Sequence, residues 1–188
     1  LVAQSLGFTI PEFAHIPIIL NPDHTKLSKR QNKVSLLEYR ADGYLPEALV
    51  NFMTLLGWNP GGNQELFTLP ELMNIFELSD INKSAAIFDI KKLDWFNAHY
   101  IKNFDENKLV ELSLPYLQKT PHWNDRSGKA MTNEFVSNVI NLEKTRIYKL
   151  SQFSDVTAYL FSDILTYDCG ILLWKDTSPD KTIKSLNH

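Results

Sequence analysis

The chain has 188 residues, of which 44% are hydrophobic and 22% charged, and its formal net charge is −3. This composition is typical of a folded globular protein and excludes an intrinsically disordered chain. The acidic balance excludes a nucleic-acid binder that relies on overall charge, so a nucleic acid would have to meet local basic patches. No apolar run reaches the roughly 18 residues of a membrane span, and we expect no membrane partner.

The cysteine content and the first residues bear on location. The single Cys169 excludes a disulfide within the chain and a cysteine-based zinc site. We therefore predict a cytoplasmic protein without a metal site. The sequence begins at Leu1 and shows no secretory signal pattern, and we expect it to be a piece of a longer protein.

The first predicted element is a buried strand over residues 13–20, an apolar run rich in branched side chains. Pro17 inside the run indicates an edge strand or a strand that begins after it. His15 is interpreted as a core histidine and not as a ligand. The sequence Asn21-Pro22-Asp23 after the strand is typical of a tight turn.

A basic loop follows this turn. Between residues 24 and 37 there are four basic residues and no acidic one, in a chain that is acidic overall. A serine flanked by lysines, as in Lys26-Leu27-Ser28-Lys29-Arg30, can hold a polyphosphate, because ammonium groups supply charge while the hydroxyl and amides supply hydrogen bonds. The alternative for this segment alone is a solvated basic loop without a ligand.

The remaining chain predicts helices and almost no strand. Capping boxes begin at Ser35 and Thr68, each with a glutamate three positions later, and Asp89 is typical of a helix N-cap. Gly43 and Gly57 are suited to helix ends. The pattern predicts helices over residues 35–41, 44–58, 68–77, 89–103, 105–113, 132–149, 153–161 and 168–174.

Within the helix from residue 89, apolar residues form a stripe that we expect to be buried. The stripe consists of Ile90, Leu93, Phe96 and Tyr100. Trp95 and His99 lie off that stripe. We interpret both rings as further core residues, and contact with a nucleic-acid backbone is the alternative.

Several of these segments together resemble one protein family. Lys26-Leu27-Ser28-Lys29-Arg30 after a strand resembles the Lys-Met-Ser-Lys-Ser signature loop of class I aminoacyl-tRNA synthetases. Its surroundings are similar to the bacterial glutamate-specific branch of that family, the glutamyl-tRNA synthetases. The similar segments are Phe13 to Pro17, Asn21 to Asp23, Val34-Ser35, Glu38 to Arg40, Gly43 to Trp58, Lys83-Ser84, Phe88-Asp89 and Lys92 to Tyr100. They keep order and spacing over about residues 12–102.

The resemblance implies an ATP-dependent ligase that activates glutamate and transfers it to tRNA(Glu). Lys29 would be the catalytic, ATP-binding lysine of the loop, and Lys26 the second catalytic lysine. Leu27, Ser28 and Arg30 would complete the ATP-binding segment. The intact enzyme would bind ATP with Mg²⁺, and we expect no cofactor on this chain alone. Its partners would be glutamate, ATP and tRNA(Glu), and we expect a monomer.

The resemblance also implies a mainly α fold. Residues 1–33 would be the end of a Rossmann-type catalytic domain, with a short strand and the signature loop. Residues 34–103 would form a helical stem-contact domain, and residues 104–188 part of a helical anticodon-binding domain. We expect six basic residues to contact tRNA: Arg40, Lys83, Lys91, Lys92, Lys144 and Arg146. The alternative is that they lie on helix faces that contact only solvent.

Two other classes of protein remain as alternatives. One is a helical RNA-binding module whose loop holds phosphate without catalysis, and the other is a structural or protein-interaction domain. The family's second ATP motif, His-Ile-Gly-His, does not occur in the 188 residues, so we expect this chain alone to be inactive. The helical pattern after Ser35 argues against glutaminyl-tRNA synthetase, which has β-barrels there. Residues 104–174 argue against a shortened tRNA-modifying paralogue.

Overall fold

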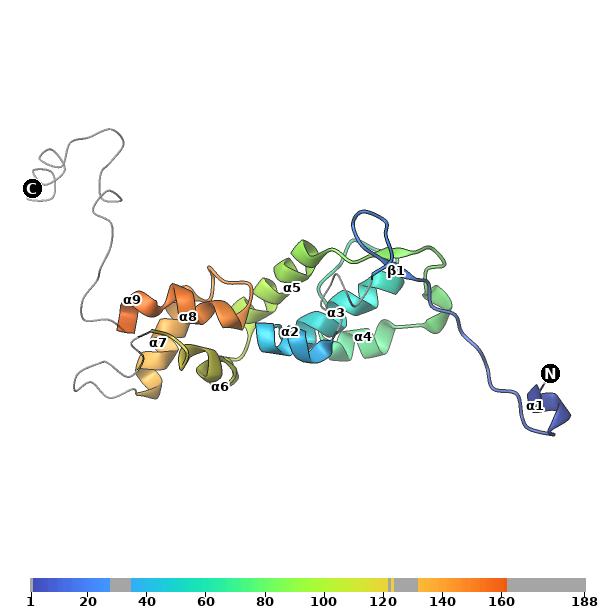
Figure 1. The fold of residues 1–188 in the computed structure, drawn as a ribbon, viewed down its shortest axis with the longest axis horizontal. Helices are drawn as coiled ribbons and strands as arrows, with labels where there is room; N and C mark the ends of the chain where they lie inside the picture. The colour runs from blue at the N-terminus through green and yellow to red at the C-terminus, as the bar shows by residue number, and fades with distance from the viewer. Residues whose placement is uncertain (1, 28–34, 122, 124–131, 162–188) are drawn as a thin grey trace, which may run out of the picture.

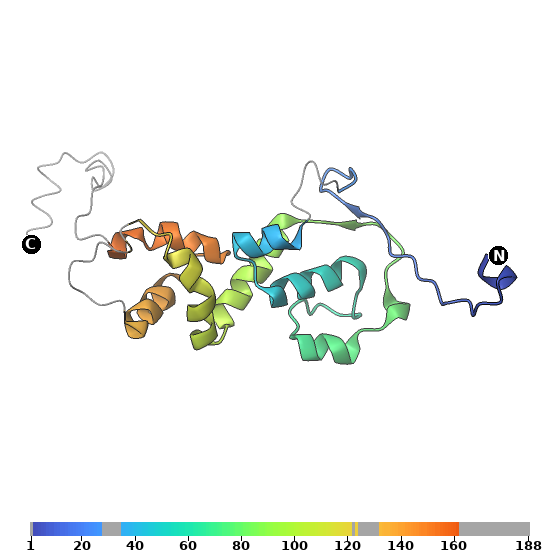
Figure 2. The same cartoon turned by 60° about the horizontal axis from the view of Figure 1, so that its bottom comes forward.

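The computed structural model describes residues 2–27, 35–121, 123 and 132–161. The described chain is mainly helical, with α5 running between two groups of helices (Figures 1 and 2). This confirms a mainly helical fold with a short sheet. The elements are α1 (Val2–Ser5), β1 (Ile19–Leu20), α2 (Leu36–Asp42), α3 (Pro46–Gly57), α4 (Leu69–Ile75), η1 (Leu78–Asp80), β2 (Ala86–Ile87), α5 (Ile90–Asn103), α6 (Glu106–Leu117), α7 (Asn133–Glu143), η2 (Leu150–Gln152), α8 (Phe153–Val156) and α9 (Ala158–Phe161).

The predicted buried strand over residues 13–20 is wrong for all but its last two residues. β1 pairs in parallel with β2, with Ile19 opposite Ala86, and β2 is a strand that the sequence pattern does not predict. Phe13 is 76% exposed, and His15 is exposed as well, so its interpretation as a core histidine is also wrong. Neither core cluster of the described residues includes a residue before position 35, so this segment is not part of the core.

Local hydrogen bonds confirm the predicted helix starts. The Glu71 carboxylate accepts from the Thr68 backbone N–H at 2.6 Å and from its hydroxyl at 2.8 Å, which caps α4. The Asp89 carboxylate accepts from the Lys91 N–H at 2.8 Å at the start of α5. Gly43 ends α2 with φ 88°, a left-handed conformation that residues with a Cβ rarely adopt.

Some predicted helix ends differ from the structure. α4 ends at Ile75, and α6 runs on to Leu117 with Pro115 inside it. The helix predicted over residues 132–149 stops at Glu143, after which the chain turns and buries Ile147 and Leu150 in the core. The helix predicted over residues 168–174 lies outside the described residues.

The main core forms where α3 packs on α5 and where α6, α7 and α8 meet. Phe52 of α3 and Phe96 of α5 are buried, and their ring centroids lie 6.0 Å apart in an edge-on contact. Leu93 and Phe96 confirm the centre of the predicted stripe, whereas Ile90 at its start is 42% exposed. An aromatic pair thus lies at the contact between the two helices.

The two groups of helices are joined by hydrogen bonds around Asn97 of α5. The Asn97 side chain accepts from the Leu45 N–H at 2.8 Å and donates to the Tyr148 carbonyl at 2.6 Å. The Leu150 N–H donates to the Gly43 carbonyl at 3.0 Å. A Cβ on Gly43 would lie 2.6 Å from the Leu150 nitrogen, so this close approach requires glycine.

Candidate functional site

A tight turn leads from β1 into the predicted signature loop. The Asn21 side-chain amide donates to the Thr25 hydroxyl at 2.9 Å and to the Lys26 carbonyl at 3.3 Å. Asp23 accepts from the Thr25 hydroxyl at 2.6 Å and from its backbone N–H at 3.0 Å, and both bonds lower the pKa of the Asp23 carboxyl. His24 has φ 63°. The turn confirms the Asn-Pro-Asp prediction and holds the start of the loop.

The structure describes only the first two residues of the predicted ATP segment. Lys26 is exposed and forms a bridge with Leu20 of β1, and the Leu27 N–H donates to the Ile19 carbonyl at 3.3 Å. The backbone of Lys26 therefore lies directly against the strand. Ser28, Lys29 and Arg30 lie outside the described residues.

The six basic residues predicted to contact tRNA lie on three parts of the fold. Arg40 is exposed on the last turn of α2. Lys83, Lys91 and Lys92 lie before β2 and at the start of α5, and all three are exposed. The remaining two, Lys144 and Arg146, follow α7.

Two of these six residues form ion pairs with other residues that the structure describes. Lys92 pairs with Glu65, and both side chains are more than 40% exposed. The Arg146 guanidinium lies 3.4 Å from the carboxylate of Glu143, which is buried and also accepts from the Tyr159 hydroxyl at 2.7 Å. The exposed Lys92–Glu65 pair contributes little to stability, so Lys92 keeps much of its freedom to meet another anion.

The interpretation of Trp95 and His99 as core residues is wrong. Trp95 is 49% exposed and His99 is exposed, because both lie beside the buried stripe of Leu93 and Phe96 and not within it. The apolar stripe that predicts Leu93 and Phe96 as buried is the signal that places these two rings outside it.

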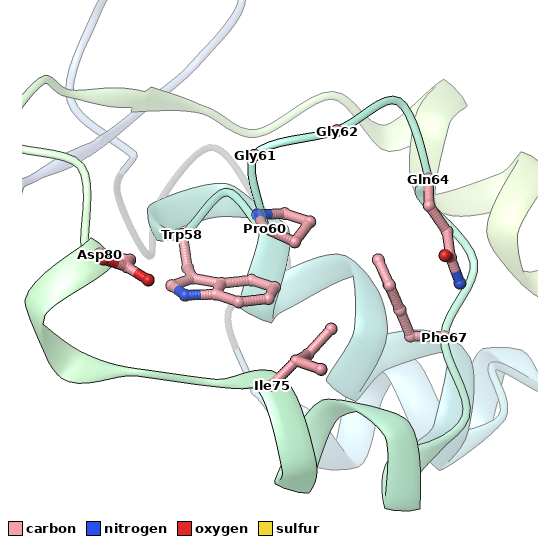
Figure 3. A pocket seen from close by; sticks show the side chains of 8 residues that line it. All are labelled: Trp58, Pro60, Gly61, Gly62, Gln64, Phe67, Ile75 and Asp80. Carbon is pink, nitrogen blue, oxygen red and sulfur yellow. The ribbon is translucent and has the colours of Figure 1, made fainter.

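A cavity of about 290 Å³ lies beside Trp58, next to the segment that follows α3 (Figure 3). Pro60 and Phe67 help to line it, and Asp80 is the charged residue on its wall. Trp58 is 2% exposed, and its indole nitrogen has no hydrogen-bond partner among the described residues.

A wider groove of about 730 Å³ lies between α2, the start of α3, and α6. Its walls include the exposed Leu37 and Leu112, with Arg40 and Lys119 also lining it. The described residues contain no group of three His, Cys, Asp or Glu side chains suited to a metal ion. None of the described helices is long and apolar enough to span a membrane.

The family model for the catalytic domain of class I tRNA synthetases (E and Q) matches residues 1–95, half of this chain. The chain belongs to that family.

The chain is similar in sequence to two bacterial ligases. The glutamate–tRNA ligase of Desulforudis audaxviator is 41% identical over 163 residues, covering 87% of this chain and 32% of the relative. That of Moorella thermoacetica is 40% identical over 168 residues, covering 89% of this chain and 34% of the relative. The chain therefore spans about a third of the length of the curated relatives it matches.

A solved structure also resembles the chain. The crystal structure of a glutamate tRNA ligase from Elizabethkingia meningosepticum, in complex with its amino acid, has a TM-score of 0.73 and 27% identity. The match covers 99% of this chain and 39% of that one. Sequence and fold thus point to the same relatives.

Proposed function

We propose that this chain is part of a glutamate–tRNA ligase, which activates glutamate with ATP and transfers it to the 3′ end of tRNA(Glu). The observation that carries the proposal is the basic segment beginning at Lys26 directly against β1, inside the family match. The relatives at 40–41% identity over nearly nine tenths of the chain support the same activity.

In the activation step, a carboxylate oxygen of glutamate attacks the α-phosphorus of ATP. A new phosphorus–oxygen bond forms, the bond to the β-phosphate oxygen breaks, and pyrophosphate leaves with the extra negative charge. Lys29 and Lys26 are the catalytic cations in this proposal, since they stabilise the charge that develops on the leaving group. Leu27, Ser28 and Arg30 complete the ATP-binding segment, and Mg²⁺ accompanies ATP as substrate.

The domain arrangement remains part of the proposal. Residues 1–33 end the Rossmann-type catalytic domain, residues 34–103 form the stem-contact domain, and residues 104–188 belong to the anticodon-binding domain. tRNA(Glu) contacts the six exposed or partly exposed cations described above. The enzyme is cytoplasmic and monomeric.

The experiment uses an enzyme of the relatives' full length that carries this segment. Lys29→Ala is expected to slow glutamate-dependent pyrophosphate exchange by about 100-fold, the usual loss when one transition-state contact is removed. Affinity for tRNA(Glu) should stay within about twofold, because the lysine serves the phosphates of ATP. Lys33→Ala, a neighbouring basic residue outside the motif, is the matched control. Equal losses of exchange and of tRNA affinity would contradict the role of Lys29.

A further inference from the structure

The groove between α2, the start of α3 and α6 has walls that are mainly apolar. We call it the α2–α6 groove, and its volume of about 730 Å³ is within the roughly 300–1,000 Å³ of small-molecule sites. Its floor includes side chains that are at most 7% exposed, namely Tyr44, Leu45 and Leu49. Leu37 and Leu112 line its edges and are 72% and 42% exposed. The groove therefore offers a ligand an apolar surface that is open to solvent.

Two cations line this groove next to Tyr116. The Tyr116 hydroxyl donates to the Arg40 carbonyl at 2.7 Å, which ties the last turn of α2 to α6. The Lys119 Nζ lies 5.5 Å from the centroid of the Tyr116 ring. Burial raises the pKa of the Tyr116 hydroxyl, whereas the Arg40 charge acts to lower it, as expected of a guanidinium near that hydroxyl. Both cations therefore lie at the same part of the groove.

The charge of these two cations is not balanced inside the groove. None of the ion pairs found among the described residues involves Arg40 or Lys119. Glu111 is the acidic residue among those that line the groove, and it is exposed. It precedes Lys119 by eight positions, which corresponds to about 12 Å along an α-helix. At that distance solvent and salt screen an exposed charge, so the part of the groove beside Tyr116 is positive.

We propose that the α2–α6 groove binds an amphipathic anion, a small molecule with an apolar body and one carboxylate. The carboxylate lies between Arg40 and Lys119, which hold it by charge-assisted hydrogen bonds. The apolar body covers the floor and the exposed leucines, and its burial supplies the rest of the affinity. A cationic head group would meet like charge beside Tyr116, and a polyphosphate would leave the apolar floor uncovered. No residue of the proposed ATP segment lines the groove, so the inference does not depend on the proposed function.

The test measures binding of decanoate to the 188-residue chain by titration calorimetry, without tRNA and below the micellar concentration of the probe. Two further probes keep the ten-carbon chain and change only the head group: 1-decanol is neutral, and decyltrimethylammonium is cationic. Decanoate is expected to bind about tenfold more tightly than 1-decanol, because it adds charge-assisted hydrogen bonds to the same apolar contact. Decyltrimethylammonium should bind more weakly than either.

Leucine methyl NMR places the bound probe. Decanoate should shift the methyl signals of Leu37, Leu49 and Leu112, which line the groove. Leu69 and Leu78 provide the comparison, since they are 52% and 68% exposed and lie outside the groove. Their signals should not move.

The two cations are tested by the double variant Arg40→Gln/Lys119→Gln. It should weaken decanoate binding by about tenfold and leave 1-decanol binding within about twofold, because only the carboxylate loses its partners. Lys108→Gln is the matched control, an exposed lysine on α6 that does not line the groove. It should bind all three probes like wild type. Urea midpoints show whether the variants are folded, and Lys119→Gln alone, at an exposed side chain, should still weaken decanoate binding by about threefold.

Several outcomes would overturn the inference. Equal affinity for the three probes, or a double variant that binds decanoate like wild type, would show that the cations hold no anion. Shifts at Leu69 and Leu78 as large as those in the groove would show unspecific association with exposed apolar side chains. Groove methyl signals that change with protein concentration in the absence of a probe would show that a second copy of the chain covers the groove. Pyrophosphate exchange tests the proposed function separately, so either can fail without the other.

Discussion

The N-terminal segment 2–27 and the helical body from residue 35 to 161 are built in different ways. The segment contributes nothing to either core cluster, and it is held by a turn and by a two-residue pairing of β1 with β2. The body buries the main cluster around α3, α5 and the helices after them. The family match spans both parts, from residue 1 to 95. Similarity in sequence to the family therefore does not show which part of the chain contributes most to the free energy of unfolding. Lys26, the first lysine of the proposed ATP segment, belongs to the less buried part.

The largest contrast is expected from removing a large apolar side chain in each part. Phe96→Ala should lower the free energy of unfolding by about 3–5 kcal/mol, because it leaves a cavity between α3 and α5. Ile16→Ala, at a side chain that is 73% exposed, should change it by less than about 0.5 kcal/mol. Urea denaturation measures both. Similar losses would show that the N-terminal segment is buried in solution.

Two glycines with positive φ give the next contrast. Gly43→Ala should cost about 3 kcal/mol, the sum of a left-handed residue and of overpacking against the backbone. Its Cβ would lie 2.6 Å from the Leu150 and Ser151 nitrogens, whereas a Cβ on Gly7, with φ +70°, would meet nothing within 4 Å. Gly7→Ala should therefore cost only the left-handed backbone conformation, about 1–2 kcal/mol, without the overpacking. A larger effect at Gly7 would contradict the comparison.

Threonines in the two parts provide a smaller contrast. Thr68→Ala removes the N-cap of α4 and should cost about 1 kcal/mol of unfolding free energy. Thr25→Val removes the hydroxyl that Asp23 accepts from, and it should change global stability by less than about 0.5 kcal/mol, since the segment has no core. The same urea titrations apply. Thr25→Val as costly as Thr68→Ala would mean that the turn belongs to the cooperative unit.

Acid titration gives the smallest and most local effect. Hydrogen bonds from Thr25 lower the pKa of Asp23, and those from Thr68 lower the pKa of Glu71. A lowered pKa adds stability above the unfolded pKa, and this is lost as pH falls through the folded value, below about pH 4. Carboxyl NMR titrations should show the pKa of Asp23 rising in Thr25→Val while that of Glu71 stays unchanged. An unchanged Asp23 would show that the turn does not persist in solution.

Helix caps and helix ends were predictable because the residues that form them lie close together in sequence. The Thr68–Glu71 box, the Asp89 cap and the Gly43 helix end each depend on hydrogen bonds or backbone preferences within a few residues. The place of Lys26 after a strand and a turn was predictable for the same reason. Long-range partners were not, and β2 was missed because Ile19 pairs with Ala86, far along the chain.

The sequence by itself determined the helical class, the helix starts, the basic loop after β1 and the family, because these depend on local hydrogen bonding, periodicity and motif order. Only the tertiary structure decided which apolar residues are covered. It left residues 13–16 exposed, brought Leu150 against Gly43, and turned Trp95 and His99 toward solvent. Burial depends on what packs against a side chain, and a pattern of residue types does not contain that information.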